Sequence, residues 1–200
     1  MTRVGILGGT FDPIHLGHLV VGEEARDRLD LDRLIFMPAG SPRLKEHIPL
    51  ASANQRLEMA RLAVGEDQFS EVSSQEVDRR GSTYTVDTLA ELREQLSEDD
   101  RLYFMVGMDA LEQFDRWREP ERLLGMCQLV VVNRVGHQRI DVNDFVGRFP
   151  AAGPGLTLLT VPRLEISSTD IRRRVREGKS IKYLTPEPVA AYIRREGLYR

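Results

Sequence analysis

The stretch GILGGTFDPIHLGHL, residues 5–19, decides the fold of this chain. It begins within a short apolar run, residues 3–7, passes through a Gly-Gly-Thr turn and enters a segment with apolar residues at helical spacing, residues 15–29. A second apolar run at residues 33–40 contains Pro and ends in Gly, which is typical of a buried parallel strand. Strand, amphipathic helix and strand in this order predict a βαβ unit.

The rest of the chain continues the alternation of strands and helices. Further apolar runs predict strands at 101–107, 127–134 and 156–161, and helical patterns are found at 52–64, 83–96, 168–178 and 185–197. This order favours an α/β fold, a doubly wound parallel sheet with a small C-terminal helical part. We expect one domain over residues 1–200, with residues 167–200 as a C-terminal helical subdomain. Residues 137–155, which are richer in Gly and Pro, are expected to form a mobile connection.

Composition limits the class of protein. Two hundred residues with 41% hydrophobic content are enough to bury a core. A formal net charge of -3 provides no overall basic field and argues against nucleic acid as a partner. The single cysteine excludes an intrachain disulfide framework. The sequence shows neither a signal peptide nor an apolar run of about 18 residues, so we expect a soluble cytoplasmic protein without a membrane partner.

The Gly-Gly-Thr turn has the chemistry of a phosphate site. In a doubly wound sheet, ligands bind at the carboxyl ends of the strands, beside helix N-termini. Gly8 and Gly9 leave the backbone open to close approach, and Thr10 adds a hydroxyl. The chain has neither the GxGxxG fingerprint nor the GxxxxGKS/T loop, so hydride transfer and P-loop chemistry lose support.

Two histidines follow this turn at helical spacing. If a helix begins near His15, then His15 and His18 share one face at its positive end, where two imidazoles form a good anion site. Simple capping or solvation of each side chain is the ordinary alternative. Zinc ligation is a further alternative, but it lacks a third ligand at suitable spacing because His47 and His137 lie in unrelated segments.

Several stretches resemble a known family. GGTFDPIHLGH at residues 8–18 resembles the HxGH signature of the nucleotidyltransferase superfamily, and EISSTDIRRRV at 165–175 resembles its ISSTxIR signature. GSTYTVDTL, GMDALEQFDRW and SIKYLTPEPVAAYIRREGLY, at 81–89, 107–117 and 180–199, are similar to the bacterial nicotinate-nucleotide adenylyltransferase family. The resemblance implies a Rossmann-like nucleotidyltransferase fold. It also implies a reaction of NAD biosynthesis in which ATP and nicotinate mononucleotide give nicotinate adenine dinucleotide and pyrophosphate.

The implied reaction suits the residues on the donor side. The attacking phosphate oxygen is already ionised near pH 7 because the second phosphate pKa is about 6, so direct in-line attack needs no general base and no covalent intermediate. Catalysis then rests on positioning and charge stabilisation. The catalytic candidates are His15, His18 and Arg172. The ATP-binding candidates are Gly8, Gly9, Thr10, Phe11, Lys45, Ser167, Ser168 and Thr169.

Lys45 stands in altered surroundings. The family commonly reads Pro-Pro-His-Lys, whereas Arg43 and Leu44 separate Pro42 from Lys45 here. The spacing from Pro42 to Lys45 is kept, which leaves a phosphate contact and a solvated loop lysine both open.

The middle motifs hold the residues expected to recognise the acceptor. Thr85 opens a helix whose N–H groups suit a carboxylate, and Trp117 is a candidate to stack on the pyridine ring, with a place in the core as the alternative. The nicotinate mononucleotide candidates are Thr85, Gly107, Asp109, Trp117 and Arg134. Asp12 is expected to hold its loop by hydrogen bonds.

Mg²⁺ is expected to arrive with ATP and to be held largely by phosphates and water, so no protein ligand for a metal is assigned. Two other functions stay open. A sister enzyme that uses phosphopantetheine or a cytidylyl donor would keep both signatures, although GSTYTVDTL and Trp117 count against it. A nucleotide-binding module without turnover is disfavoured by the intact His15, His18 and Arg172. The sequence also leaves a homo-oligomer open.

Overall fold

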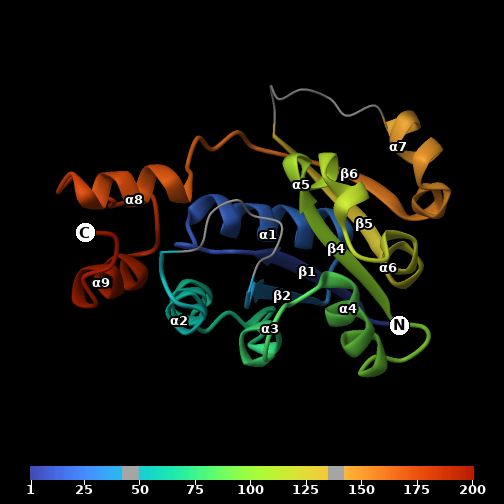
Figure 1. Cartoon of the computed structure of the whole chain (residues 1–200), viewed down its shortest axis with the longest axis horizontal. Coiled ribbons are helices and arrows are strands. Elements are labelled where there is room, and N and C mark those ends of the chain that lie inside the picture. Colours follow the sequence, from blue (N-terminus) through green and yellow to red (C-terminus); the bar gives the residue numbers. More distant parts are fainter. Residues whose placement is uncertain (42–49, 135–141) are drawn as a thin grey trace.

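A six-stranded parallel sheet forms the centre of the molecule (Figure 1). The computed structural model describes residues 1–41, 50–134 and 142–200. In the described part of the chain the strand order is β3-β2-β1-β4-β5-β6, which confirms the predicted doubly wound sheet. The strands are β1 (Arg3–Gly9), β2 (Arg33–Pro38), β3 (Ser70–Val72), β4 (Arg101–Gly107), β5 (Gln128–Arg134) and β6 (Leu156–Val161).

Helices cover both faces of this sheet. The α-helices are α1 (Leu16–Leu29), α2 (Ala53–Val64), α3 (Gln75–Asp78), α4 (Thr85–Glu94), α5 (Met108–Glu112), α6 (Pro120–Met126), α7 (Val142–Arg148), α8 (Ser168–Arg176) and α9 (Glu187–Arg195). The described residues also form the 3-10 helices η1 (Phe114–Arg116) and η2 (Pro150–Gly155). The helices predicted at 15–29, 52–64 and 83–96 correspond to α1, α2 and α4.

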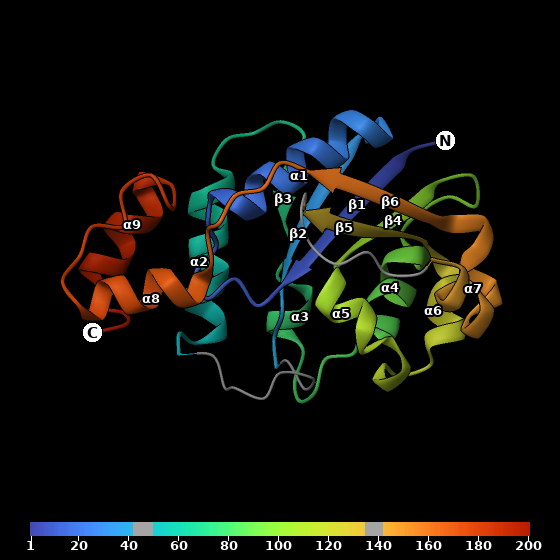
Figure 2. The ribbon, with the colours of Figure 1, turned by 90° about the horizontal axis from the view of Figure 1, so that it is seen from above.

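The strands send alternate side chains into two apolar cores. In β1, Val4 and Ile6 belong to one core and Leu7 belongs to the other. The core that contains Leu7, here called the first core, is covered by α1, α2, α8 and α9, and the second core by α4, α5, η1, α6 and α7. Figure 2 shows α1 on one side of the strands and α4, α5 and α6 on the other.

Local signals account for the start of α2. Ser52 is its N-cap and accepts a hydrogen bond from the Gln55 N–H at 3.3 Å, while the Gln55 side chain accepts one from the Ser52 N–H at 2.9 Å. This reciprocal pair is a capping box, which satisfies two backbone donors that the helix cannot satisfy itself. The helical pattern predicted at residues 52–64 therefore begins where this cap lies.

The two C-terminal helices lie beyond the carboxyl ends of the strands. In Figure 2 they are on the side toward which the arrows of β5 and β6 point. Ile171, Val189 and Ile193 are at most 1% exposed and belong to the first core, which they share with α1 and α2. The description of residues 167–200 as a subdomain stays a prediction.

Part of the segment expected to be a mobile connection forms helices instead. Residues 142–148 and 150–155 are α7 and η2, while residues 137–141 lie outside the described residues. Phe145 and Phe149 account for this local order because both rings pack against Phe114, with centroids 5.5 Å and 5.2 Å from it. Burial of three aromatic rings favours order over the flexibility that Gly and Pro suggest.

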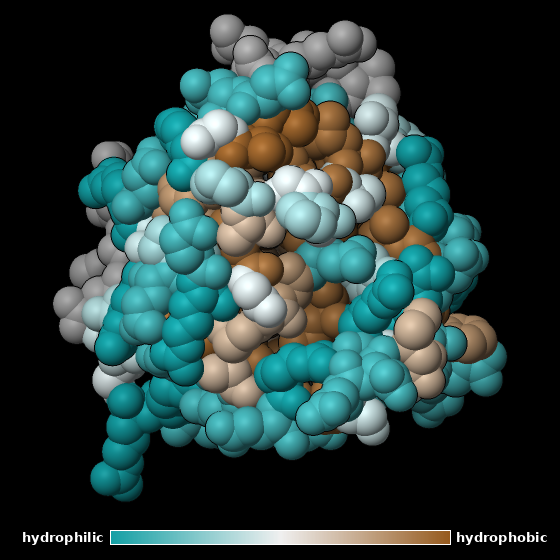
Figure 3. Space-filling model, turned by 90° about the vertical axis from the view of Figure 1, so that its right-hand side faces the viewer, coloured by the Kyte–Doolittle hydropathy of each residue, from teal (hydrophilic) through white to brown (hydrophobic). Residues whose placement is uncertain are grey.

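The end of the molecule that carries α6 and α7 shows apolar residues gathered among polar ones (Figure 3). A pocket of about 330 Å³ opens at the amino ends of β4 and β5, where Arg101, Leu102, Cys127 and Gln128 line it. The pocket therefore lies at the opposite end of the strands from Gly9. No described helix is both long and apolar enough to cross a membrane.

Replacement of Phe114 by Ala tests the aromatic cluster. Phe114 is fully buried, so we expect the Phe114→Ala variant to lose about 3–5 kcal/mol of the free energy of unfolding in urea denaturation. Phe69, which is 43% exposed, is the matched control, and Phe69→Ala should cost less than about 1 kcal/mol. Equal losses in the two variants would contradict the role given to Phe114.

Candidate active site

The point where the chain changes direction across the sheet lies between β1 and β4. From β1 the chain passes to β2 on one side, and it later returns to β4 on the other. Leu7 of β1 pairs with Met105 of β4, so Gly8, Gly9 and Gly107 lie together at the carboxyl ends of these two strands. In doubly wound sheets this crevice is where ligands bind. The donor candidates Gly8 and Gly9 and the acceptor candidate Gly107 are therefore brought to one end of the sheet.

The turn after β1 is shaped by Phe11. Its backbone φ of +51° lies in the left-handed region, and its ring is only 2% exposed. A Cβ on Gly9 would lie 2.6 Å from a carbon of that ring, so only glycine fits at this position. Gly8 is exposed beside it. Because its ring is buried, Phe11 has only its backbone to offer a ligand at this turn.

His15 and His18 stack on each other at the start of α1. His15 is the N-cap residue and is 3% exposed, whereas His18 is half-buried. The ring centroids are 3.8 Å apart with an interplanar angle of 26°. The His15 backbone N–H donates to Nδ1 of His18 at 3.2 Å. Because Nδ1 of His18 accepts, the ring proton lies on Nε2, which is therefore a donor.

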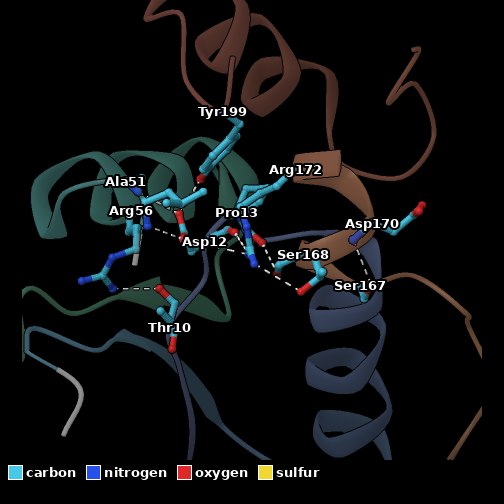
Figure 4. A network of polar contacts seen from close by, with 12 residues as sticks. Thr10, Asp12, Pro13, Ala51, Arg56, Ser167, Ser168, Asp170, Arg172 and Tyr199 are labelled. Carbon is cyan, nitrogen blue, oxygen red and sulfur yellow. Dashed lines mark hydrogen bonds and ion pairs between the residues drawn. The ribbon is translucent and has the colours of Figure 1, made fainter. Parts of the chain in front are cut away.

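Polar side chains near α8 hold the carbonyl groups of the turn (Figure 4). Arg172 Nη1 donates to the Asp12 carbonyl at 2.7 Å, and the Ser168 hydroxyl donates to the Pro13 carbonyl at 2.8 Å. The Thr185 hydroxyl donates to the next carbonyl, that of Ile14, at 2.9 Å. Three consecutive carbonyls are thus held by residues that lie more than 150 positions later.

The other members of the second signature lie at the same place. The Ser167 hydroxyl caps α8 by accepting the Asp170 N–H at 3.1 Å, and the Thr169 hydroxyl accepts from Arg172 Nη2 at 3.2 Å. The structure thus brings the two signatures together, as the resemblance implied. Contacts of Ser167, Ser168, Thr169 and Arg172 with phosphate stay predictions.

On the acceptor side, the start of α4 lies beside the segment that follows η1. The Arg118 guanidinium lies 4.7 Å from the centre of the Tyr84 ring and 3.5 Å from the Asp87 carboxylate. Tyr84 is the N-cap of α4, and its side chain makes no cap hydrogen bond. These contacts of Arg118, the residue after Trp117, hold the segment after η1 beside the N-terminus of α4, where Thr85 lies.

The remaining acceptor candidates follow β4 and β5. Trp117 is half-buried and packs on Phe114 with centroids 5.2 Å apart. Asp109 is exposed, and its Oδ1 would be 3.4 Å from a Cβ on Gly107, so this carboxylate lies over the glycine. Arg134 ends β5, and its side chain lies outside the described residues, as do Lys45 and the rest of 42–49.

A buried carboxylate organises the turn. Asp12 is 5% exposed, and its oxygens accept from the Leu50 N–H at 2.9 Å, the Ala51 N–H at 3.1 Å and the Tyr199 hydroxyl at 2.7 Å. The expectation that Asp12 holds its loop is confirmed by these bonds. Burial and the adjacent carboxylate raise the pKa of Tyr199, so this hydroxyl keeps its proton and donates it.

A second buried network was not predicted from the sequence. Arg56 is 1% exposed and donates to the Thr10 carbonyl at 2.8 Å and to the Gly40 carbonyl at 2.9 Å. On the other side of Gly40, its backbone N–H bonds to the Glu76 carboxyl, which also accepts from the Thr88 hydroxyl at 3.0 Å. The network joins the donor turn to α4.

Burial governs the charges of this network. Burial lowers the pKa of Arg56, and the Asp12 carboxylate opposes that shift. Burial raises the pKa of Glu76, although hydrogen bonds from Thr88 and Thr83 oppose the shift. Both effects follow from the cost of placing a charge away from water. Among the described residues, no three His, Cys, Asp or Glu side chains gather in a way that could hold a metal ion.

Comparison with known proteins identifies the family. The sequence model of the cytidylyltransferase-like family matches residues 6–174. A protein of Roseiflexus sp., called a "probable nicotinate-nucleotide adenylyltransferase", is 50% identical over 197 residues, which cover 98% of each chain. The chain belongs to the nicotinate-nucleotide adenylyltransferase family. A relative of the same description from Moorella thermoacetica is 45% identical over 99% of this chain and 92% of its own.

Solved structures of the same enzyme class share the fold. The nicotinic acid mononucleotide adenylyltransferase of Plasmodium falciparum complexed with APC has a TM-score of 0.78 and 21% identity, and it covers 100% of this chain and 98% of its own. The same enzyme complexed with NaAD gives 0.77 and 23%, with the same coverage. The Rossmann-like nucleotidyltransferase fold that the resemblance implied is confirmed.

Replacement of Glu76 by Gln tests its buried carboxyl. Because the pKa of Glu76 is raised above 4.5, the folded chain binds this proton more tightly than the unfolded chain. The resulting stability is fully present below about pH 4.5 and is lost as pH rises through the raised pKa. The free energy of unfolding of the wild type, minus that of Glu76→Gln, should therefore fall as pH rises in urea denaturation.

The exposed Glu94 on the same side of the sheet is the control. The difference between the wild type and Glu94→Gln should stay flat over the same pH range. A difference for Glu76→Gln that grows with pH would show that burial does not dominate at this carboxyl.

Proposed function

We propose that the chain transfers the adenylyl group of ATP to nicotinate mononucleotide at the crevice between β1 and β4, with release of pyrophosphate. The full-length relative that is 50% identical supports this activity most directly. The stacked His15 and His18 at the start of α1 support the place of the reaction. An α-helix N-terminus with two imidazoles suits the triphosphate of ATP.

The chemistry requires little from acids or bases. The ionised phosphate oxygen of nicotinate mononucleotide attacks the α-phosphorus of ATP, and the bond from that phosphorus to the bridging oxygen breaks as pyrophosphate leaves. No proton has to be removed from the nucleophile near pH 7. The work of the protein is to align two polyanions and to stabilise the charge that develops on the leaving group.

The donor side is assigned to the turn and to α8. We assign His18 Nε2–H and His15 to the charge that builds on the transferred phosphate, with Arg172 on the leaving pyrophosphate. Arg172 uses Nη1 for the Asp12 carbonyl and Nη2 for Thr169, and a guanidinium carries five N–H donors in all. The remaining assignments for ATP are Gly8, Gly9, Thr10, the Phe11 backbone, Lys45, Ser167, Ser168 and Thr169.

The residues assigned to nicotinate mononucleotide lie mainly on the side of the sheet that the second core covers. The backbone N–H groups at the start of α4, where Thr85 lies, suit the pyridine carboxylate, and Trp117 offers a half-buried ring for stacking. Asp109, exposed beside Gly107, is placed to accept from ribose hydroxyls. Arg134 completes the assigned set.

Mg²⁺ fits this site as a companion of ATP. The carboxylate of the turn itself, that of Asp12, already accepts the N–H groups of Leu50 and Ala51 and the Tyr199 hydroxyl, so it is a poor candidate for a metal ligand. Mg²⁺ usually keeps several waters and binds through substrate phosphates. It would supply positive charge on the phosphate oxygens, and no side chain of the described residues is assigned to it.

The activity is tested by pyrophosphate release with ATP and Mg²⁺. We expect nicotinate mononucleotide to be used strongly in preference to nicotinamide mononucleotide and to phosphopantetheine. Preference for the first acceptor would support the carboxylate pocket at α4. Turnover with another acceptor alone would overturn the acceptor site and leave the donor site in place, and no turnover with any acceptor would favour a binding module.

The role of His18 is tested by replacing it with Ala and with the two amide side chains Gln and Asn. His18→Ala should lower kcat by about 10²–10³-fold, with a much smaller change in the KM for ATP, because its donor acts in the transition state. A Gln side chain can place its nitrogen near the position of Nε2, and an Asn side chain can place its nitrogen only near Nδ1. Part of the lost kcat should therefore return in His18→Gln and not in His18→Asn. Equal activity of the two amides would contradict the assignment of Nε2.

A further inference from the structure

We infer that Tyr199 is a positioning residue of the donor site, acting through the Asp12 carboxylate on the turn that carries His15 and His18. This inference rests on the proposed function. Tyr199 lies beyond α9 and is 7% exposed, far along the sequence from the turn that it contacts. Its hydroxyl donates to Oδ1 of Asp12 at 2.7 Å (Figure 4).

The Asp12 carboxylate is the point through which this contact reaches the turn. Its two oxygens also accept the N–H groups of Leu50 and Ala51, which directly precede α2. Its own carbonyl is held by Arg172. The carboxylate therefore fixes the distance between the turn, α2 and the segment after α9, and Tyr199 is its only hydroxyl donor within the described part of the chain.

Loss of the Tyr199 hydroxyl removes one hydrogen-bond donor from the buried Asp12 carboxylate. Oδ1 of Asp12 would keep only the Ala51 N–H among its described donors, at 3.1 Å. A buried carboxylate that loses a donor shifts toward another donor or toward water. Asp12 is three residues from His15, so such a shift moves the imidazoles relative to the ATP phosphates. Misplacement by about 1 Å can cost about 100-fold in rate.

The effect should be confined to one substrate. Thr85 opens α4, which packs in the second core, and Trp117 packs against that core, whereas Tyr199 belongs to the first core. A defect at Asp12 should therefore change the parameters for ATP and leave the KM for nicotinate mononucleotide nearly unchanged. General loosening of the fold would affect both substrates, or would only reduce the active fraction.

Tyr199→Phe is the test, with Tyr192→Phe as its matched control. Tyr192 is also buried in the first core, at 8% exposure, but its hydroxyl makes no hydrogen bond to the turn or to any other described residue. With steady-state kinetics well below the melting temperature, Tyr199→Phe should lower kcat/KM for ATP about tenfold. The KM for nicotinate mononucleotide should stay within about twofold, and Tyr192→Phe should behave as the wild type.

The inference is overturned if Tyr199→Phe keeps kcat/KM for ATP within about twofold of the wild type. An equal loss in Tyr192→Phe, or an equal rise in the KM of both substrates, would overturn it as well. Because each value is relative to the wild type, failure of the wild type to turn over would instead contradict the proposed function.

A double variant tests the inference if Tyr199→Phe folds poorly. In Asp12→Asn/Tyr199→Phe the group that loses the hydroxyl donor carries no charge, which lowers the cost of its burial, although the Asn nitrogen then faces the Leu50 N–H. The double variant should show the same loss that is specific to ATP. Wild-type kinetics in this double variant would overturn the inference. The affinity for a non-hydrolysable ATP analogue, measured by calorimetry, should fall in parallel.

Discussion

The buried carboxylate of Asp12 is the interaction on which the donor site depends. A carboxylate away from water is tolerated only when donors surround it, and here two backbone N–H groups and one tyrosine hydroxyl do so. These donors come from before α2 and from beyond α9, so satisfying one charge fixes three segments relative to one another. The turn with Gly8 and Gly9 takes its shape within that frame.

The residues assigned to the two substrates are held by elements that cover opposite faces of one sheet. The donor turn is braced by α2, α8 and the segment after α9, all of which bury their apolar side chains in the first core. The acceptor candidates Thr85 and Trp117 lie on α4 and after η1, which pack in the second core, and Gly107 ends β4, which contributes to both cores. Gly40 links the two sides, since its carbonyl binds Arg56 and its N–H binds Glu76. The reaction would take place where the two halves meet.

The sequence predicted what local signals encode. Alternation of apolar runs and helical patterns was enough for five of the six described strands, and the helical pattern from residue 52 marked the start of α2. The short strand β3 was missed because its three residues form no apolar run. Asp12 was expected to brace its loop, but its partners could not be predicted, because Tyr199 is 187 positions away and no spacing rule connects them. Arg56 lies in a helical pattern where a charged residue is typical of a solvated face. Its burial depends on carbonyls that only the folded chain brings to it.

The bracing of residues 12–14 also bears on how the protein is made. Each of these three carbonyls is held by a side chain from residues 168–185, and Asp12 waits for Tyr199 as well. A ribosome releases the strand and the glycine turn more than 150 residues before the side chains that brace them. The nascent chain therefore carries an unfinished donor site until Tyr199 has been made and can reach Asp12. Contacts of such long sequence separation also slow folding, because a large loop must close before they form.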